Sequence, residues 1–208
     1  MHGPQKHFGV IDVLRGMVFV DHMNFNIALG TYYGTRGEKS PNLDYNTVFP
    51  GVVSMVKGVS HTKTFIFAPE PDKFLMNDPY LCGYYKWVQG MKNAKYIDVI
   101  EGRYIARPVS DGVAMDINDH SSYYKVEKGT DINLAIHAIT KAHNNAYDVA
   151  FVLSADTDYI SLYRQLKTMG KMVVAVAVKG QKLGKVIPEV DDHIILDDSF
   201  FSQHIRTK

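Results

Sequence analysis

Short apolar segments recur along the chain and alternate with stretches in which apolar residues return every three or four positions. The apolar segments are rich in β-branched and aromatic residues, which is typical of strands covered on both faces. Residues 149–153 and 171–178 show this pattern most clearly. The pattern predicts strands over residues 17–21, 61–68, 96–101, 149–153, 171–178 and 193–196.

Prolines and glycines mark the expected breaks in this pattern. Pro69 and Pro71 are expected to stop the second strand, because proline cannot donate to a ladder of backbone hydrogen bonds. Residues 42–58 are helical in part, with an interruption at Pro50-Gly51. Residues 102–107 continue the third strand as a hairpin, and residues 109–122 are expected to form a loop.

Helices are expected between the strands. One begins at Pro79, a residue that suits the first turn of a helix, and ends near Gly90. Another takes Thr130 as its N-cap. A third follows Asp158 and ends at Gly170, the kind of residue that closes a helix. The predicted apolar stripe of the second helix consists of Ile132, Ala135, Ile136 and Ile139.

The alternation of strands and helices predicts an α/β fold with a mostly parallel sheet and helices on both of its faces. We find no internal repeat or linker, so residues 1–208 are expected to form a single domain. Residues 1–16 are an N-terminal extension whose structure the pattern does not predict, although a short strand or helical turn is an option at residues 10–14.

Composition narrows the function classes. Of 208 residues, 46% are hydrophobic and the formal net charge is +1, so a nucleic-acid binder would need a local basic surface. Cys82 is the single cysteine, which excludes a disulfide or a cysteine zinc site within the chain. No apolar run approaches the length of a membrane span, and the first residues do not resemble a signal peptide. We therefore expect a cytoplasmic protein with no membrane contact.

Aspartates follow two of the predicted strands. Asp21 ends the first strand, and Asp156 and Asp158 follow the strand at residues 149–153. The carboxyl ends of parallel strands meet at one edge of a sheet, where ligands bind. Asp131 stands at the start of the preceding helix and joins this group only if its loop crosses the same edge. Each aspartate also has an ordinary explanation as a helix cap or as a charge that complements a helix dipole.

Two polar residues accompany the aspartates. Asn24 follows Asp21 and would otherwise be a turn former, and Ser154 would otherwise be a small buried residue bonded to the backbone. Taken together, the group predicts a site for a hard divalent cation, because carboxylates that lie close together repel one another and such a cation offsets their repulsion. The histidines lack the paired spacing of a zinc site, and no Ser-His-Asp or Cys-His pattern appears.

Four ordered segments resemble a known family. They are Val-Phe-Val-Asp21-His-Met-Asn24-Phe, Glu127-Lys128-Gly129-Thr-Asp131-Ile-Asn-Leu-Ala, Phe-Val-Leu-Ser154-Ala-Asp156-Thr-Asp158-Tyr, and Gly170-Lys-Met-Val-Val. Their order and spacing, from about residue 17 to 195, are similar to the NYN-domain (LabA-like) branch of the PIN-like nucleases. The bulky pair His22-Met23 departs from the family pattern, and residues 30–50 and 109–122 look specific to this chain.

The resemblance implies a PIN-like three-layer α/β/α sandwich and metal-dependent cleavage of RNA. It implies that one or two Mg²⁺ or Mn²⁺ ions are held by the acidic centre, and that a metal-bound water attacks the phosphodiester. By position, the acidic centre comprises Asp21, Asp131, Asp156 and Asp158, with Asn24 and Ser154 as polar support and Lys128 as a basic position.

Candidates for RNA contact lie outside the acidic centre. Lys128, Arg103 and Arg107 could bind the RNA backbone, although solvated surface charge is an equal explanation for the two arginines. Tyr123, Tyr124 and Tyr159 could stack on bases, and packing in the core or at its rim is the ordinary alternative.

Other function classes remain open at this stage. A catalytically inactive PIN-like module that binds RNA or a protein is the main alternative to an endoribonuclease. A Rossmann-like enzyme is disfavoured, because no Gly-x-Gly-x-x-Gly follows the first strand. A phosphatase with a nucleophilic aspartate is disfavoured because Asp21-x-x-Asn24 lacks the second acid that such an enzyme would use two residues on. DNA as the substrate and a homo-oligomeric state both stay possible.

Overall fold

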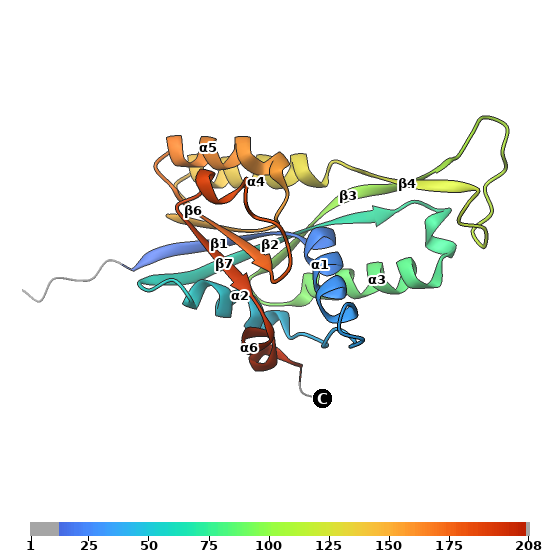
Figure 1. Ribbon diagram of the computed structural model, residues 1–208. Helices are drawn as coiled ribbons and strands as arrows, with labels where there is room; N and C mark the ends of the chain where they lie inside the picture. Colours follow the sequence, from blue (N-terminus) through green and yellow to red (C-terminus); the bar gives the residue numbers. More distant parts are fainter. Residues whose placement is uncertain (1–12, 207–208) are drawn as a thin grey trace, which may run out of the picture.

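A seven-stranded sheet forms the middle of the structure, and β1 (Leu14–Asp21) is its central strand. The structure is a computed structural model that describes residues 13–206 (Figure 1). The strand order is β4-β3-β2-β1-β5-β6-β7; β4 pairs antiparallel with β3, and the other neighbours pair in parallel. The remaining strands are β2 (Val59–Pro71), β3 (Ile97–Pro108), β4 (Tyr123–Lys128), β5 (Val149–Leu153), β6 (Met172–Val178) and β7 (Asp192–Leu196).

Helices cover both faces of the sheet and give three layers (Figure 1). Residues of β1 alternate between the two cores: Val18 and Val20 pack on one side, Met17 and Phe19 on the other. This confirms the predicted α/β fold with a mostly parallel sheet. One face carries α4 (Thr130–His143) and α5 (Ile160–Thr168), and the other carries α1 (His22–Gly34), α2 (Tyr45–Ser54), α3 (Pro79–Gly90) and α6 (Asp198–Phe201).

Two predicted breaks at prolines are wrong. β2 runs through Pro69 to Pro71, because β1 ends opposite Phe67 and leaves the last part of β2 with β3 as its neighbour. On the side of β2 that has no neighbouring strand, the missing N–H of a proline costs no hydrogen bond between strands. α2 likewise runs through Pro50 from Tyr45 to Ser54, and so loses one backbone bond without ending.

The predicted apolar stripe of α4 is confirmed at Ala135 and Ile139, which pack against the core, and is wrong at its other two residues. Ile132 and Ile136 are 65% and 55% exposed, whereas Leu134 and Ala138 are fully buried against the sheet. Small residues on the buried face let the helix approach the sheet closely. The N-cap is Gly129, at φ 83°, instead of Thr130, which is the first residue of the helix and is buried.

β4 and the end of β3 form an arm that projects beyond the rest of the sheet, with the expected loop at residues 109–122 between them (Figure 1). β3 continues to Pro108 as predicted, and its partner is β4, which the sequence pattern left unassigned. The helix ends predicted at Gly90 and Gly170 are confirmed. Residues 14–16 belong to β1, and the option at residues 10–14 otherwise falls mainly outside the described residues.

Candidate acidic centre at the carboxyl edge of the sheet

Asp21 caps a helix and also presents its carboxylate at the carboxyl edge of the sheet. It is the last residue of β1 and the N-cap of α1, where its Oδ1 accepts a hydrogen bond from the backbone N–H of Asn24 at 3.1 Å. The neighbouring strand β5 ends level with it, since Val20 pairs with Leu153. Asp21 is only 6% exposed, so its carboxylate lies at the bottom of this edge of the sheet.

Tyr159 connects Asp21 to Asp131. Its hydroxyl lies 2.8 Å from Asp131 Oδ1 and 3.3 Å from Asp21 Oδ2. The hydroxyl has one proton and lies within hydrogen-bond distance of both carboxylates, so the start of α4 does reach the end of β1. Burial and these two negative charges raise the pKa of Tyr159 above its ordinary value. The alternative in which Tyr159 stacks on a base is wrong, because the side chain is buried.

Ser154 and Asn24, the two polar residues of the predicted site, lie next to this pair of carboxylates. The buried Ser154 Oγ donates to Asp21 Oδ2 at 3.3 Å and accepts from the backbone N–H of Asp156 at 3.2 Å. Asn24 Oδ1 accepts from Gln181 Nε2 at 2.9 Å, a contact the sequence did not suggest. These bonds orient Asp21 and tie the loop after β6 to the same edge.

Asp156 and Asp158 lie further out. Asp156 Oδ1 accepts a hydrogen bond of 3.0 Å from the backbone N–H of Asp158, so Asp156 caps the short 3₁₀ helix Thr157–Tyr159. Asp158 is exposed and lines a cavity of about 300 Å³ together with Asp131. The capping explanation therefore holds for Asp156, and neither residue makes a hydrogen bond to Asp21 among the described residues.

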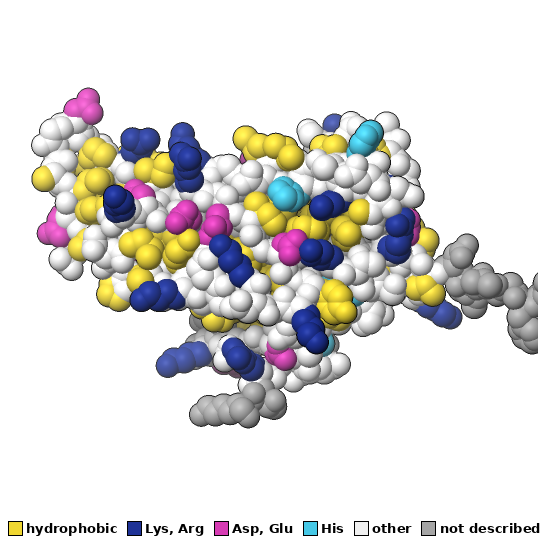
Figure 2. Space-filling model, turned by 180° about the vertical axis from the view of Figure 1, so that it is seen from behind, with side chains coloured by type: hydrophobic (Ala, Val, Ile, Leu, Met, Phe, Trp, Pro, Cys, Tyr) yellow, Lys and Arg dark blue, Asp and Glu magenta, His cyan; other side chains and the backbone are white. Residues whose placement is uncertain are grey.

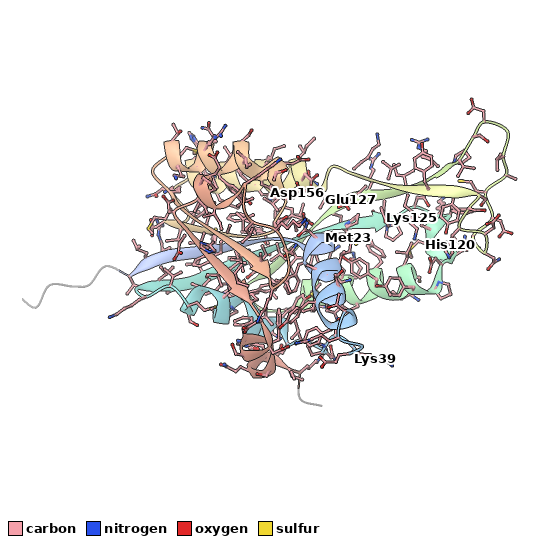
Figure 3. The ribbon with its side chains drawn as sticks, viewed as in Figure 1. Met23, Lys39, His120, Lys125, Glu127 and Asp156 are labelled. Carbon is pink, nitrogen blue, oxygen red and sulfur yellow. The ribbon has the colours of Figure 1, made fainter. Side chains whose placement is uncertain are left out.

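Glu127 is a member of the group that the sequence reasoning missed as a site residue. It is labelled with Asp156 in Figure 3 and comes from the edge strand β4. Burial, and after it the negative charges of Glu127 and Asp131, raise the pKa of Asp21 to about 6. The pKa of Glu127 is also raised, first by partial desolvation and then by Asp131, although its surface is exposed. In the sequence, only its position directly before Lys128-Gly129 could have indicated that Glu127 belongs to the site.

The basic candidates share one face of the arm. In the β3–β4 register, Arg103 lies opposite Lys128, and Arg107 lies opposite Tyr124, which is 53% exposed. Residues directly opposite in an antiparallel pair point to the same face. Figure 2, viewed from behind, shows Lys and Arg side chains spread over this part of the molecule. Tyr123 points to the other face and is buried against Phe74, so its stacking role is wrong.

The donor chemistry suits a hard divalent cation. Asp21, Asp131 and Glu127 present carboxylate oxygens, the ligands that Mg²⁺ and Mn²⁺ prefer. No salt bridge among residues 13–206 neutralises any of the three. As the side chains lie, however, no three His, Cys, Asp or Glu residues in the described part of the chain form a group that could hold a metal. The residues fit such an ion by their chemistry, and Tyr159 lies between two of them.

Comparisons with known proteins agree with the fold. A family model described as the NYN domain matches residues 15–197. A crystal structure of a protein of unknown function from Vibrio parahaemolyticus superposes with a TM-score of 0.54 at 19% identity, covering 91% of this chain and 96% of that one. At that identity the likeness concerns the fold alone. A search of curated proteins gives no match. No helix within residues 13–206 is long and apolar enough to cross a membrane.

Proposed function

The chain belongs to the NYN-domain family, a PIN-like family of nuclease type, and from that premise we propose that it is a metal-dependent endoribonuclease. The observation that supports this most directly is the close approach of Asp21 and Asp131 through the Tyr159 hydroxyl. Three elements bring carboxylates to one place at the carboxyl edge of the sheet. Burial first, and then the neighbouring carboxylates, raise the pKa of Asp21, and a bound cation would relieve the repulsion between the carboxylates.

The proposed roles follow from the contacts. Asp21, Asp131 and Glu127 would hold Mg²⁺ or Mn²⁺, with Asp156 and Asp158 as outer ligands through water. When bound, the cation supplies an activated water and stabilises charge on the phosphate. Ser154 orients Asp21 by its hydrogen bond, and Asn24 orients it through its backbone N–H. For the cation to bind between them, the Tyr159 hydroxyl would have to give up its hydrogen bond to at least one of the two carboxylates.

RNA would approach along the arm. Arg103, Arg107 and Lys128 share one exposed face and would neutralise phosphates of the substrate. Tyr124 lies on the same face and offers a surface on which a base could stack. Contacts of this kind position an RNA strand without reading its sequence.

A cleavage assay tests the proposal. The protein is incubated with single-stranded RNA in Mn²⁺, in Mg²⁺ and in EDTA, and with DNA of the same sequence. Asp21→Asn and Asp131→Asn are expected to lower the rate at least about a hundred-fold, because the cation contributes several kcal/mol to transition-state stabilisation. Asp111→Asn, in the exposed loop at residues 109–122, is the matched control and keeps full activity. Cleavage in EDTA, or unchanged rates in both variants, would contradict the proposal.

A catalytically inactive RNA- or protein-binding module is the second candidate. Two observations favour it: the Tyr159 hydroxyl lies between Asp21 and Asp131, and Asp156 is used as a cap. A module of this kind binds RNA equally well in EDTA and shows no Mn²⁺-dependent rise in thermal stability. A resident cation at a hundred times its Kd would stabilise the fold by about 2.7 kcal/mol. Thermal unfolding with and without Mn²⁺ therefore separates the two candidates even before a substrate is known.

A further inference from the structure

A pocket with aromatic walls lies between α1 and α3, beside the acidic centre and outside the roles assigned so far. Its volume is about 480 Å³, within the range of small-ligand sites. Tyr45, Tyr80, Tyr84 and Trp87 supply aromatic surface, and Asn26, Ser40 and Asn42 add amide and hydroxyl groups. Tyr80 and Trp87 remain 71% and 37% exposed, which is unusual for large aromatic rings with nothing to cover them.

A buried histidine holds these walls in place. His22 is fully buried, and its two ring nitrogens lie 2.6 Å from the Tyr84 hydroxyl and 3.1 Å from the Tyr45 hydroxyl. The Trp87 ring centre lies 5.4 Å from that of His22 and 5.2 Å from that of Tyr45. Since both nitrogens are engaged and the rings pack against each other, the pocket is formed before any ligand arrives.

The same histidine connects the pocket to the acidic centre. His22 is the residue directly after Asp21 and the first residue of α1. The Tyr84 hydroxyl, which belongs to the pocket wall, lies 2.6 Å from His22 Nδ1. One residue, His22, therefore connects the pocket wall to Asp21, which it follows in the chain.

A basic residue lies toward the far end of the pocket. Figure 3 labels Met23 at the β1 end of α1 and Lys39 beyond the opposite end of the helix. Lys39 is exposed and directly precedes Ser40, which lines the pocket. With a cation bound at the acidic centre, a ligand that spans from there to Lys39 would carry negative charge at both ends, as a strand of RNA does.

We propose that this pocket binds one base of a single-stranded RNA, adjacent to the phosphodiester that reaches the acidic centre. The inference rests on the proposed function and adds a subsite to it. Bases splayed out of single strands stack on aromatic side chains, and their edges form hydrogen bonds with amides such as those of Asn26 and Asn42. A purely apolar partner would leave those amides unpaired, which disfavours it.

The single tryptophan provides a direct test. Trp87 is the one tryptophan in the chain, so its fluorescence reports on the pocket. In EDTA, where cleavage is off, titration with a short single-stranded RNA is expected to quench this fluorescence. Nucleoside monophosphates are expected to quench it at higher concentration, and ribose 5-phosphate is expected to leave it unchanged.

A glycine in the pocket wall provides a variant that blocks the site. Gly83 lines the pocket, and an added Cβ would meet nothing within 4 Å. Gly83→Leu therefore adds a side chain at the pocket wall whose Cβ meets no protein atom, and it is expected to weaken RNA binding about ten-fold, the effect of losing one stacked base. Gly30→Leu is the matched control, because Gly30 is also an exposed helical glycine with open space around it and lies outside the pocket. Circular dichroism checks that both variants fold.

The outcomes separate this inference from the nuclease assignment. Quenching that Gly83→Leu removes and Gly30→Leu keeps supports the base pocket, whether or not the protein cleaves RNA. Cleavage in Mn²⁺ without any change in Trp87 fluorescence overturns the pocket and leaves the nuclease assignment intact. Equal quenching by ribose 5-phosphate also overturns it. Self-association of the wild type that Gly83→Leu abolishes would assign the pocket to a protein contact instead.

Discussion

The Tyr159 hydroxyl is the hydrogen-bond donor that lies between two carboxylates of the acidic centre. Tyr159→Phe removes the hydroxyl that bonds Asp131 and lies close to Asp21. We expect the free energy of unfolding in EDTA to fall by about 1–2 kcal/mol, since a hydrogen bond to a charged group is lost and the carboxylates repel each other without a donor between them. Urea denaturation measures the change. Added Mn²⁺ should stabilise the variant at least as much as the wild type.

Tyr163 is the matched control for that experiment. Its hydroxyl is buried and has no hydrogen-bond partner among the described residues. Tyr163→Phe should therefore leave the free energy of unfolding unchanged or raise it slightly. If Tyr163→Phe were as destabilising as Tyr159→Phe, the effect of Tyr159 would come from ring packing and not from its hydroxyl.

An ion pair at the opposite edge of the sheet gives a dependence on pH. The guanidinium of Arg15 lies 2.8 Å from Asp148 and, by hydrogen bonding, lowers the pKa of Asp148 to about 2. A carboxylate whose pKa is lowered by folding adds stability above its unfolded pKa of 3.8, and this stability is lost as the pH falls toward 2. The pair is partly exposed, so its contribution is no more than about 1 kcal/mol.

Asp148→Asn tests this dependence. The variant should be less stable than the wild type at pH 7, and the difference should shrink as the pH falls below about 4, where the Asp148 carboxylate of the unfolded wild-type chain begins to take up its proton. Denaturation midpoints measured from pH 7 to pH 3 give the comparison. A gap that stays constant over this range would mean that the charge of Asp148 does not contribute.

At the scale of elements, one glycine lets β3 approach the start of α4. A Cβ on Gly102 would lie 2.9 Å from the carbonyl oxygen of Lys128 and would collide with Thr130. Gly102→Ala therefore has to shift the turn that carries Glu127 and Asp131. We expect a loss of about 1–3 kcal/mol in unfolding free energy together with weaker Mn²⁺ binding. Calorimetric titration with Mn²⁺ measures the second effect, and Gly30→Ala, with open space at its Cβ, should show neither.

Sequence patterns predicted the strands that contain a continuous apolar run and missed the edge strand β4. Residues 17–20 of β1 and all residues of β5 and β6 are apolar, so their runs reveal them. Three of the six residues of β4 are charged, and β4 therefore resembles a loop. In α4, Ile132 and Ile136 fit a helical stripe as well as Leu134 and Ala138 do, and only tertiary packing decides which face is buried.

The same distinction applies to the site. The positions of Asp21 and Ser154 follow from the ends of parallel strands, so sequence reasoning found them. Glu127 arrives through the register of an antiparallel edge strand, and Tyr159 through the direction in which a 3₁₀ turn points its ring. The spacing of residues in the sequence predicts neither the strand register nor the direction of the ring. For Asp156 the sequence pattern left a helix cap and a metal ligand both open, and the structure shows the cap.

At the scale of the whole molecule, the net charge is close to zero, so attraction to RNA has to come from a local group of basic residues. If Arg103, Arg107 and Lys128 contact phosphates, replacing all three by Gln should reduce the slope of log K against log salt by about 2, at roughly 0.7 per phosphate for single strands. Fluorescence anisotropy with labelled RNA at several salt concentrations measures the slope. Binding should weaken for every sequence tested, since phosphate contacts carry no sequence information.

A second triple variant controls for total charge. Lys57, Lys95 and Lys171 lie just before β2, β3 and β6, at the opposite edge of the sheet. Replacing these three by Gln changes the net charge by the same amount and should leave the slope unchanged. An equal change in both triple variants would mean that the arm has no particular role in binding.

The central place of β1 in the strand order has a consequence for how the protein assembles. Gly16 pairs with His61 on one side and with Val149 on the other, so the two partners of β1 arrive after loops of very different length. Pairings that are near in sequence form earlier, and distant ones form later. The nearer pairing can therefore be complete while the other edge of β1, with its apolar residues, is still open to other chains. Asp21 belongs to the early half of the sheet and Ser154 to the late half, so the acidic centre is among the last parts of the molecule to form.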